Sequence, residues 1–145
     1  MGVKNIKLIY VIKIMLYTKS IFEPLEARDG IRISVMSRHT LNDGKTPDPK
    51  ITEKSYYEWH RTLAPPDELV GAYYKRGLEW DVFEREYKEH LSIKPVIYHV
   101  RSLATRATNQ DITILCVEPK GENCHRIILA EECLKYHPEL KIEHR

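Results

Sequence analysis

The sequence predicts an α/β fold, a three-layer sandwich in which a small, largely parallel sheet is flanked by helices. Three features indicate this fold: alternating apolar stretches early in the chain, a nearly continuous apolar run at residues 111–117, and amphipathic segments around that run. The chain has 145 residues, of which 42% are hydrophobic, enough for one substantial core. We therefore expect a single domain over residues 1–145.

The first strand signal lies at the start of the chain. Apolar residues occupy the even positions from 6 to 16, the period-two pattern of a strand with one buried face. Met15 is an internal methionine just before the next apolar stretch. Residues 1–14 are therefore either an edge strand of the domain or an N-terminal extension of a shorter one.

Two further strands are predicted before the helical part of the chain. Residues 16–21 and 31–36 both carry strand-forming apolar residues, and a loop with Pro24 and an Asp-Gly pair separates them. Residues 37–51 contain Asn-Asp-Gly and two prolines, so we expect a long surface loop there.

Four helices are predicted between this loop and the continuous apolar run. Apolar spacing at i, i+3, i+4 and i+7, together with capping residues, Pro and Gly, indicates their limits. The predicted helices are residues 52–63 (Thr52 as cap; Tyr56, Trp59, His60 and Leu63 as stripe), 67–76, 78–91 and 93–108.

The last third of the chain predicts a strand, a helix and a final short strand. Residues 111–117 are typical of an inner strand that is buried on both faces. A helix capped by Asn123 is expected over 123–136, and residues 140–144 predict a closing strand. In parallel sheets ligands bind beyond the carboxyl ends of the strands, near helix N-termini.

Five reactive side chains surround this predicted strand-to-helix turn: Cys116, Glu118, Cys124, His125 and Arg126. The first turn of a helix favours negative charge, and a neighbouring guanidinium or imidazolium stabilises a thiolate. The pattern therefore favours Cys124 as the nucleophile, with Cys116 as its partner and Arg126 as part of an anion site.

Four interpretations of the turn remain open on the sequence alone. The first is an anion site with a reactive cysteine. The second is a redox pair of Cys116 and Cys124, without the compact C-x-x-C spacing. The third is a metal site formed with Glu118 and His125, although a regular helix cannot easily direct adjacent Cys and His side chains at one ion. The fourth is simple packing, with a Glu118–Arg126 salt bridge.

Several segments together resemble the DUF488 family, a group of small, mostly prokaryotic proteins of uncharacterised function. They are LYTKSIFEP, DGIRISVM, the block from LAPPDELV to EREYKEHL, and CVEPKGENCHRIILAEECL. The resemblance covers nearly all of residues 15–136, and its most specific part is Cys-x-Glu followed by Cys-His-Arg. Many members have Arg-x-Trp-Pro-Arg-Gly after the second strand, whereas this chain keeps only Arg38 there. The resemblance implies the fold and the location of the site rather than a mechanism.

Two other basic residues are candidates for the same site. Arg38 follows the second predicted strand and Lys19 ends the first. If these strands run parallel to residues 111–117, both residues lie at the sheet edge that carries Cys116. For each, a solvated surface charge is the simpler alternative.

Composition narrows the function classes. A net charge of +2 gives little support to nucleic-acid binding. The apolar N-terminus is interrupted by Lys7 and Lys13 and is too short to span a membrane, and three cysteines without a secretory signal favour a reducing cytoplasm. We expect a cysteine-dependent hydrolase or transferase that binds a small anionic molecule such as a phosphate or carboxylate, without cofactor or metal. The alternative is a non-catalytic ligand- or nucleic-acid-binding module, or a thiol redox protein.

Overall fold

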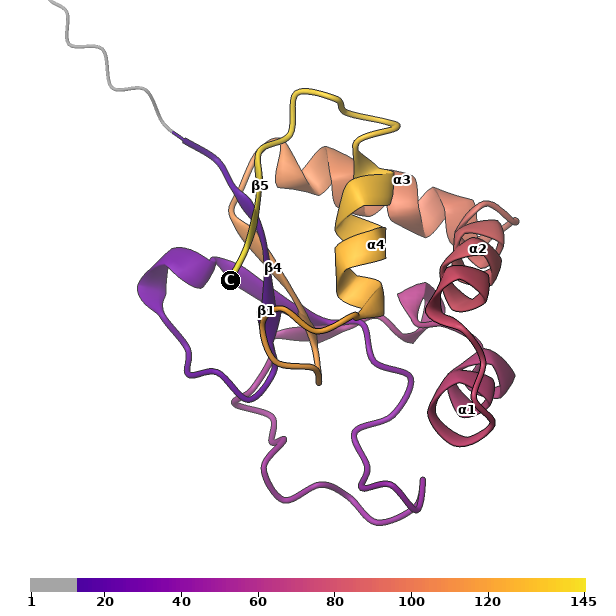
Figure 1. Cartoon of the computed structure of the whole chain (residues 1–145). Coiled ribbons are helices and arrows are strands. Elements are labelled where there is room, and N and C mark those ends of the chain that lie inside the picture. Colours follow the sequence, from indigo (N-terminus) through magenta and orange to yellow (C-terminus); the bar gives the residue numbers. More distant parts are fainter. Residues whose placement is uncertain (1–12) are drawn as a thin grey trace, which may run out of the picture.

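A five-stranded parallel sheet forms the centre of the protein in the computed structural model, which describes residues 13–145 (Figure 1). The strand order is β3-β2-β4-β1-β5, and every neighbouring pair is parallel. The strands are β1 (Leu16–Ser20), β2 (Ile31–Ser34), β3 (Glu58–Trp59), β4 (Ile112–Cys116) and β5 (Ile142–His144).

Four α-helices lie together on one side of this sheet (Figure 1). They are α1 (Asp67–Lys75), α2 (Trp80–Leu91), α3 (Val96–Ala107) and α4 (His125–Cys133). The opposite side is covered by the segment that contains the short 3-10 helix η1 (Ala27–Asp29). The predicted α/β sandwich with a parallel sheet is confirmed, and its third layer consists of this short segment.

Strand β4 lies in the middle of the sheet and explains the continuous apolar run. It pairs with β2 on one side and with β1 on the other, and all five of its residues are buried. A strand covered on both faces has no polar alternation. The main core lies between the sheet and α2, α3 and α4, and includes Leu16, Ile33, Ile114 and Leu129.

The predicted helix over residues 52–63 is wrong. The segment forms the two-residue edge strand β3 and a 3-10 turn, η2 (Arg61–Leu63). The amides of Tyr57 and His60 donate to the carbonyls of Arg32 and Ser34 at 2.8 and 2.9 Å, so β2 takes the backbone bonds that a helix would have made within itself. The apolar spacing there reflects aromatic packing, since Trp59 stacks on His39 with ring centroids 3.9 Å apart.

The other predicted elements are present with small shifts at their ends. The helix predicted at 93–108 is α3, which begins after Pro95, and the strand predicted at 140–144 is β5. Gly77 has a φ of 73° beyond the end of α1, a left-handed conformation that favours glycine. The strand predicted for the even positions 6–16 falls largely on residues 1–12, outside the described residues.

Buried charges occupy the η1 side of the sheet. Asp29 is fully buried and accepts from Lys19 at 3.0 Å, from Arg32 at 2.8 Å and from Arg145 at 2.9 Å. Glu26 receives Lys19 at 2.9 Å and Arg145 at 2.7 Å. We call these five residues the Asp29 ion cluster. Burial raises the pKa of Asp29, but hydrogen bonds from the Glu26 amide, Arg32 and Lys19 outweigh it and lower that pKa.

Candidate functional site

The carboxyl ends of β2 and β4 form the base of the candidate site. Cys116 is the last residue of β4, and Val35 follows the end of β2, which pairs with β4. After β4 the chain turns through residues 117–124 and enters α4 at His125. This is the edge at which parallel sheets bind ligands.

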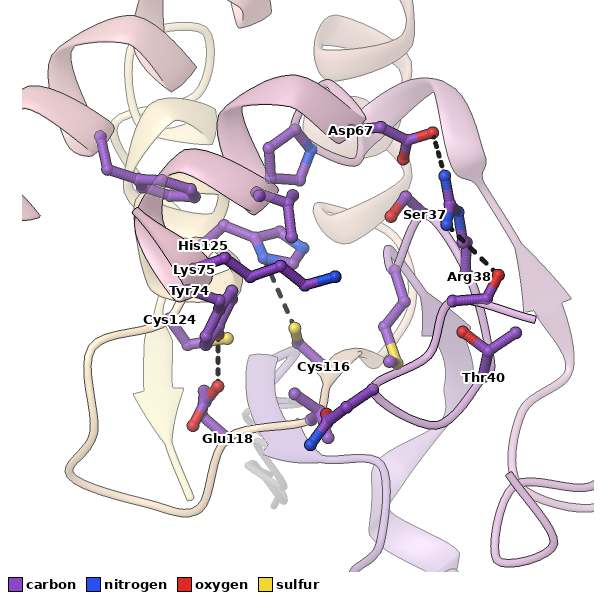
Figure 2. A pocket seen from close by; sticks show the side chains of 18 of the residues that line it. Ser37, Arg38, Thr40, Asp67, Tyr74, Lys75, Cys116, Glu118, Cys124 and His125 are labelled. Atoms are coloured by element: carbon purple, nitrogen blue, oxygen red, sulfur yellow. Dashed lines mark hydrogen bonds and ion pairs between the residues drawn. The ribbon is translucent and has the colours of Figure 1, made fainter. Parts of the chain in front are cut away.

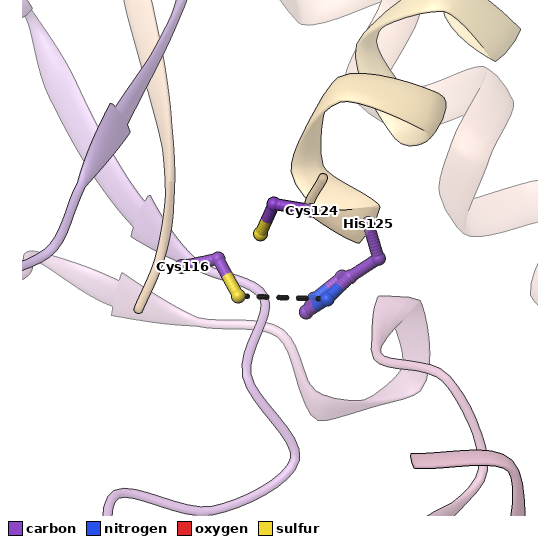
Figure 3. Close-up of side chains that lie close together, drawn as sticks. All are labelled: Cys116, Cys124 and His125. Carbon is purple, nitrogen blue, oxygen red and sulfur yellow. Dashed lines mark hydrogen bonds between the residues drawn. The ribbon is translucent and has the colours of Figure 1, made fainter. Parts of the chain in front are cut away.

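Cys116, Cys124 and His125 converge at this edge (Figure 3). One sulfur or ring-nitrogen atom from each residue lies within 4.8 Å of the other two, and Cys116 Sγ is 3.5 Å from His125 Nδ1. Cys124 and His125 can face the same point because Cys124 is the N-cap of α4, with extended backbone at φ −152° and ψ 144°. Sequence reasoning placed Cys124 inside the first turn, with Asn123 as the cap. The cap is one residue later, so the objection that a regular helix cannot aim both side chains together does not apply.

The tautomer of His125 follows from its second partner. Its Nε2 lies 2.8 Å from the carbonyl oxygen of Val35, which can only accept, so Nε2 carries a proton. Nδ1 therefore faces the thiols. In the neutral ring it is a free acceptor, and in the imidazolium it donates a hydrogen bond to a thiolate. The ring of Tyr87 packs edge-on against His125 with centroids 5.5 Å apart, and this contact fixes the imidazole plane.

The two thiols differ in their acidity. Burial raises the pKa of both. For Cys124 this effect is outweighed by hydrogen bonds from the Cys116 thiol and His125 and by the charges of His125 and Arg126, so its pKa lies well below the ordinary value. The neighbouring Cys124 charge raises the pKa of Cys116 further. These opposite shifts favour ionisation of Cys124 over ionisation of Cys116.

Arg126 follows His125 in the first turn of α4 and does not line the cavity. It is 1% exposed, its Nη2 is 3.5 Å from the Pro119 carbonyl oxygen, and its Nε and Nη1 have no hydrogen-bond partner among the described residues. Among residues 13–145 it forms no ion pair with a carboxylate. An uncompensated buried charge is costly, and a thiolate at Cys124 is the anion available to balance it. The Glu118–Arg126 salt bridge of the packing interpretation does not form.

A cavity of about 390 Å³ opens above the thiols (Figure 2). Cys116, Glu118, Cys124, His125 and Arg38 line it. The remaining wall comes from residues 36–44, from α1 and from the start of α2. Although Cys116 and Cys124 are only 3% and 2% exposed, their place in the cavity wall gives a small molecule access to them.

Glu118 and Arg38 are held at the wall by partners from α1. The Tyr74 hydroxyl donates to Glu118, and burial together with this carboxylate raises the pKa of Tyr74. Arg38 pairs with Asp67 at 2.8 Å and donates to the Gly44 carbonyl at 3.3 Å. These contacts connect α1 to the turn after β4 and to the loop of residues 36–44.

Lys19, like Arg126, is a predicted anion-binding residue that does not line the cavity. It belongs to the Asp29 ion cluster on the η1 side of the sheet, not to the cavity wall. Side chains alternate between the two faces of a strand, so Lys19 points away from the face that carries Cys116.

Comparison with family models places this geometry in a known group. A model described as the active DUF488-N3 subclade, DUF488-N3a, matches residues 16–137. The chain belongs to the DUF488 family. Searches of curated proteins and of solved structures found no match. Within residues 13–145 of this DUF488 protein, no helix combines the length and apolar character needed to cross a bilayer.

Several residues that line the cavity of this DUF488 protein are not predicted as site residues by the sequence, among them Tyr74, Lys75 and Trp80. The apolar pattern of the α1 and α2 segments led to the interpretation that their aromatic residues pack in the core. Tyr74 and Lys75 lie beside the stripe of Leu69, Ala72 and Tyr73 rather than within it. Their position outside this apolar stripe is the sequence feature that distinguishes them from core residues.

The ligand atoms of Cys116, Cys124 and His125 also determine which metal ion the site could bind. Two thiols and an imidazole nitrogen are donor types that bind zinc, but within the described part of the chain no fourth protein donor completes a closed structural site. Cys116 and Cys124 are free thiols, as is the buried Cys133 in α4. The arrangement provides an acidic thiol, a neighbouring proton acceptor and a cavity above both.

Proposed function

We propose that this DUF488 protein is a cysteine-dependent hydrolase or transferase that acts on a small molecule in the cavity, with Cys124 as nucleophile. The observation that carries the proposal is the convergence of Cys116, Cys124 and His125 beside the buried Arg126. Two nitrogen atoms of this guanidinium lack a hydrogen-bond partner within residues 13–145, and its charge lowers the pKa of Cys124. A buried cation without a carboxylate favours a thiolate beside it, and a thiolate is the reactive form of cysteine.

In the first step the Cys124 thiolate attacks an electrophilic carbon of the substrate. The Sγ–C bond forms, the bond to the leaving group breaks, and the leaving group takes the proton that Cys124 had given to His125 Nδ1. Cys116 donates its S–H to the resting thiolate. The Val35 carbonyl holds the His125 ring in the orientation that this proton transfer requires.

In the second step water or an acceptor molecule releases the enzyme. His125 Nδ1 accepts a proton from the incoming group, which attacks the carbon, and the C–Sγ bond breaks to restore the thiolate. Glu118, held by the Tyr74 hydroxyl, positions the incoming group from the cavity wall.

The proposal is tested with p-nitrophenyl acetate, a small activated ester. Wild-type protein should release a burst of p-nitrophenolate equal to about one equivalent per chain, as expected for an accumulating acyl-enzyme. The acetyl group should be found on Cys124 by peptide mass spectrometry. Cys124→Ala should abolish the burst, and Cys133→Ala should retain it because Cys133 lies in the core, away from the cavity.

Two results would contradict the proposal. One is an acetyl group on a surface lysine or on Cys133 while Cys124 remains free. The other is a Cys124 that reacts with iodoacetamide no faster at neutral pH than a free cysteine, whose pKa is about 8.5. Either result leaves a non-catalytic binding module as the function.

The short distance between the two site thiols favours a second candidate, a thiol redox protein. Mild oxidation would then join Cys116 to Cys124, with loss of two protons and two electrons to the added oxidant. Titration of free thiols after exposure to oxidised glutathione separates the candidates. A redox protein loses both site thiols together and regains them with dithiothreitol, whereas the proposed nucleophile forms a mixed disulfide at Cys124 alone.

A further inference from the structure

The charged side chains that line the cavity differ in whether another residue pairs with them. Two cations and two carboxylates line it: Arg38, Lys75, Asp67 and Glu118. Arg38 pairs with Asp67 at 2.8 Å, and Glu118 accepts from the Tyr74 hydroxyl. The ammonium group of Lys75 has neither an ion pair nor a hydrogen bond to any residue in the described range. It is therefore the cavity cation that is available to a ligand.

Lys75 is placed so that it can meet a ligand over the thiols. It is the last residue of α1, and its side chain extends from that helix into the cavity near His125 (Figure 2). The reactive form of Cys124 in the proposed function is a thiolate, which carries one negative charge. An anionic substrate approaching that thiolate is repelled unless a cation lies beside its path, and Lys75 supplies that cation from the solvent side.

The rest of the cavity wall suits an organic group rather than a bare ion. Met36, Leu41, Val70, Trp80 and Phe83 contribute apolar or aromatic surface to it. Trp80 and Phe83 stack with centroids 4.9 Å apart and an interplanar angle of 14°. A ligand that fills this space gains from the burial of apolar area while its polar end stays near Lys75.

We propose that the substrate is an organic anion whose carboxylate or phosphate group is bound by Lys75 and whose apolar part contacts Val70, Trp80 and Phe83. This inference rests on the proposed function, because it names the substrate class for the reaction at Cys124. It assigns the binding of the anionic group to Lys75, which lines the cavity, and not to Arg126 or Lys19, which do not.

Iodoacetate and iodoacetamide test the inference without knowledge of the natural substrate. Both alkylate a thiolate, with formation of an Sγ–C bond and release of iodide, and they differ mainly in the negative charge of iodoacetate. At low ionic strength the ratio of the iodoacetate to the iodoacetamide rate constant at Cys124 should exceed that of free cysteine. Lys75→Gln should lower this ratio by about fivefold, the size expected for one exposed charge in a high dielectric.

A matched control removes a lysine outside the cavity. Lys54 is exposed, and Lys54→Gln changes the net charge by the same amount as Lys75→Gln. The ratio should keep its wild-type value in Lys54→Gln, and in the wild type it should fall as salt is added. An unchanged ratio in Lys75→Gln would overturn the inference while leaving the nucleophile intact. Slow reaction with both reagents would instead overturn the proposed function.

The apolar part of the inference is tested by protection of Cys124 from iodoacetamide. Benzoate should protect better than acetate, which lacks the ring, and better than benzamide, which lacks the charge. In Lys75→Gln the advantage of benzoate over benzamide should be lost, whereas both should still protect through the ring. Equal protection by acetate and benzoate in the wild type would contradict an apolar subsite.

Discussion

The two faces of the sheet bury positive charge in opposite ways. On the η1 side, the Asp29 ion cluster places Lys19, Arg32 and Arg145 against the carboxylates of Asp29 and Glu26. On the α4 side, Arg126 is equally buried, yet two of its nitrogen atoms have no hydrogen-bond partner in the part of the chain that the structure describes. A compensated cluster maintains the fold, whereas an uncompensated cation changes the chemistry of the groups beside it.

The difference matters because an unpaired buried charge raises the free energy of the folded protein. At the Asp29 ion cluster, ion pairs offset this desolvation cost, so the cluster affects stability. At Arg126 it is reduced when a nearby thiol ionises, so the same cost lowers the pKa of Cys124. The comparison predicts that mutations on the two faces will separate stability from reactivity.

The largest effect is expected when the compensating carboxylate is removed. Asp29→Asn leaves three buried or nearly buried cations against Glu26 alone. We expect the free energy of unfolding to fall by about 3–5 kcal/mol, the usual cost of breaking a buried ion pair from one side. Urea unfolding followed by tryptophan fluorescence measures it.

The control for Asp29→Asn is Glu53→Gln, at an exposed position, which should change the unfolding free energy by less than about 0.5 kcal/mol. The alkylation rate of Cys124 in the folded fraction should stay within about twofold of wild type, since Asp29 lies on the other side of the sheet. A loss below about 1 kcal/mol in Asp29→Asn would show that the cluster is not what stabilises this face.

Removal of Arg126 should have the opposite signature. Arg126→Met keeps an unbranched apolar side chain and deletes the charge, so the pKa of Cys124 should rise. The pH midpoint of iodoacetamide alkylation then moves upward, and the rate at neutral pH falls by up to about tenfold. The unfolding free energy should change by less than about 1 kcal/mol or increase. The substitution removes the desolvation cost of the guanidinium and breaks no ion pair with a carboxylate of the described residues.

Arg126→Lys is the matched control, since it keeps the charge and should keep most of the thiol acidity. Destabilisation of Arg126→Met as large as that of Asp29→Asn, with an unshifted pH midpoint, would reverse the comparison. Arg126 would then be a structural residue, and the acidity of Cys124 would depend on His125 and Cys116.

These two faces also mark where sequence reasoning succeeded and where it failed. The parallel sheet, the turn after β4 and the approach of Cys116, Cys124 and His125 follow from hydrophobic period and from the rule for strand ends. Lys19 was assigned to the correct edge but to the wrong face. Successive side chains of β1 point to opposite faces of the sheet, so the position of Lys19 in the strand decides its face. All residues of β1 and β4 are buried, so the sequence does not show which of them share a face with Cys116.

The remaining misses have a common cause. The stripe at Tyr56, Trp59, His60 and Leu63 fits a helix, yet β2 offers backbone partners that no local pattern reveals. The cavity role of Lys75 depends on the placement of α1 over the β4–α4 turn, which is a long-range contact. Local propensity is a weak guide wherever such tertiary contacts decide the outcome.

The smallest predicted effect concerns the ion pair of Glu58 and Arg106. It is intermediate between the Asp29 ion cluster and Arg126, because it is paired but partly exposed. Glu58 on β3 receives both terminal nitrogens of Arg106 at 2.8 Å. These hydrogen bonds, which outweigh partial burial, lower the pKa of Glu58 to about 2. Glu58→Gln should therefore reduce the unfolding free energy at pH 7 by only about 1 kcal/mol.

The pH dependence gives this prediction its sign. The folded-state pKa of Glu58 lies below the unfolded value of 4.5, so its contribution is complete above about pH 5 and is lost as pH falls through 4.5 toward 2. The wild type and Glu58→Gln should converge in stability near pH 2, as measured by urea unfolding at pH 7, 4 and 2.5. A difference that persists unchanged at pH 2.5 would mean that the side chain acts through packing. The charge of Glu58 would then affect neither stability, as in the Asp29 ion cluster, nor the reactivity of a neighbouring group, as at Arg126.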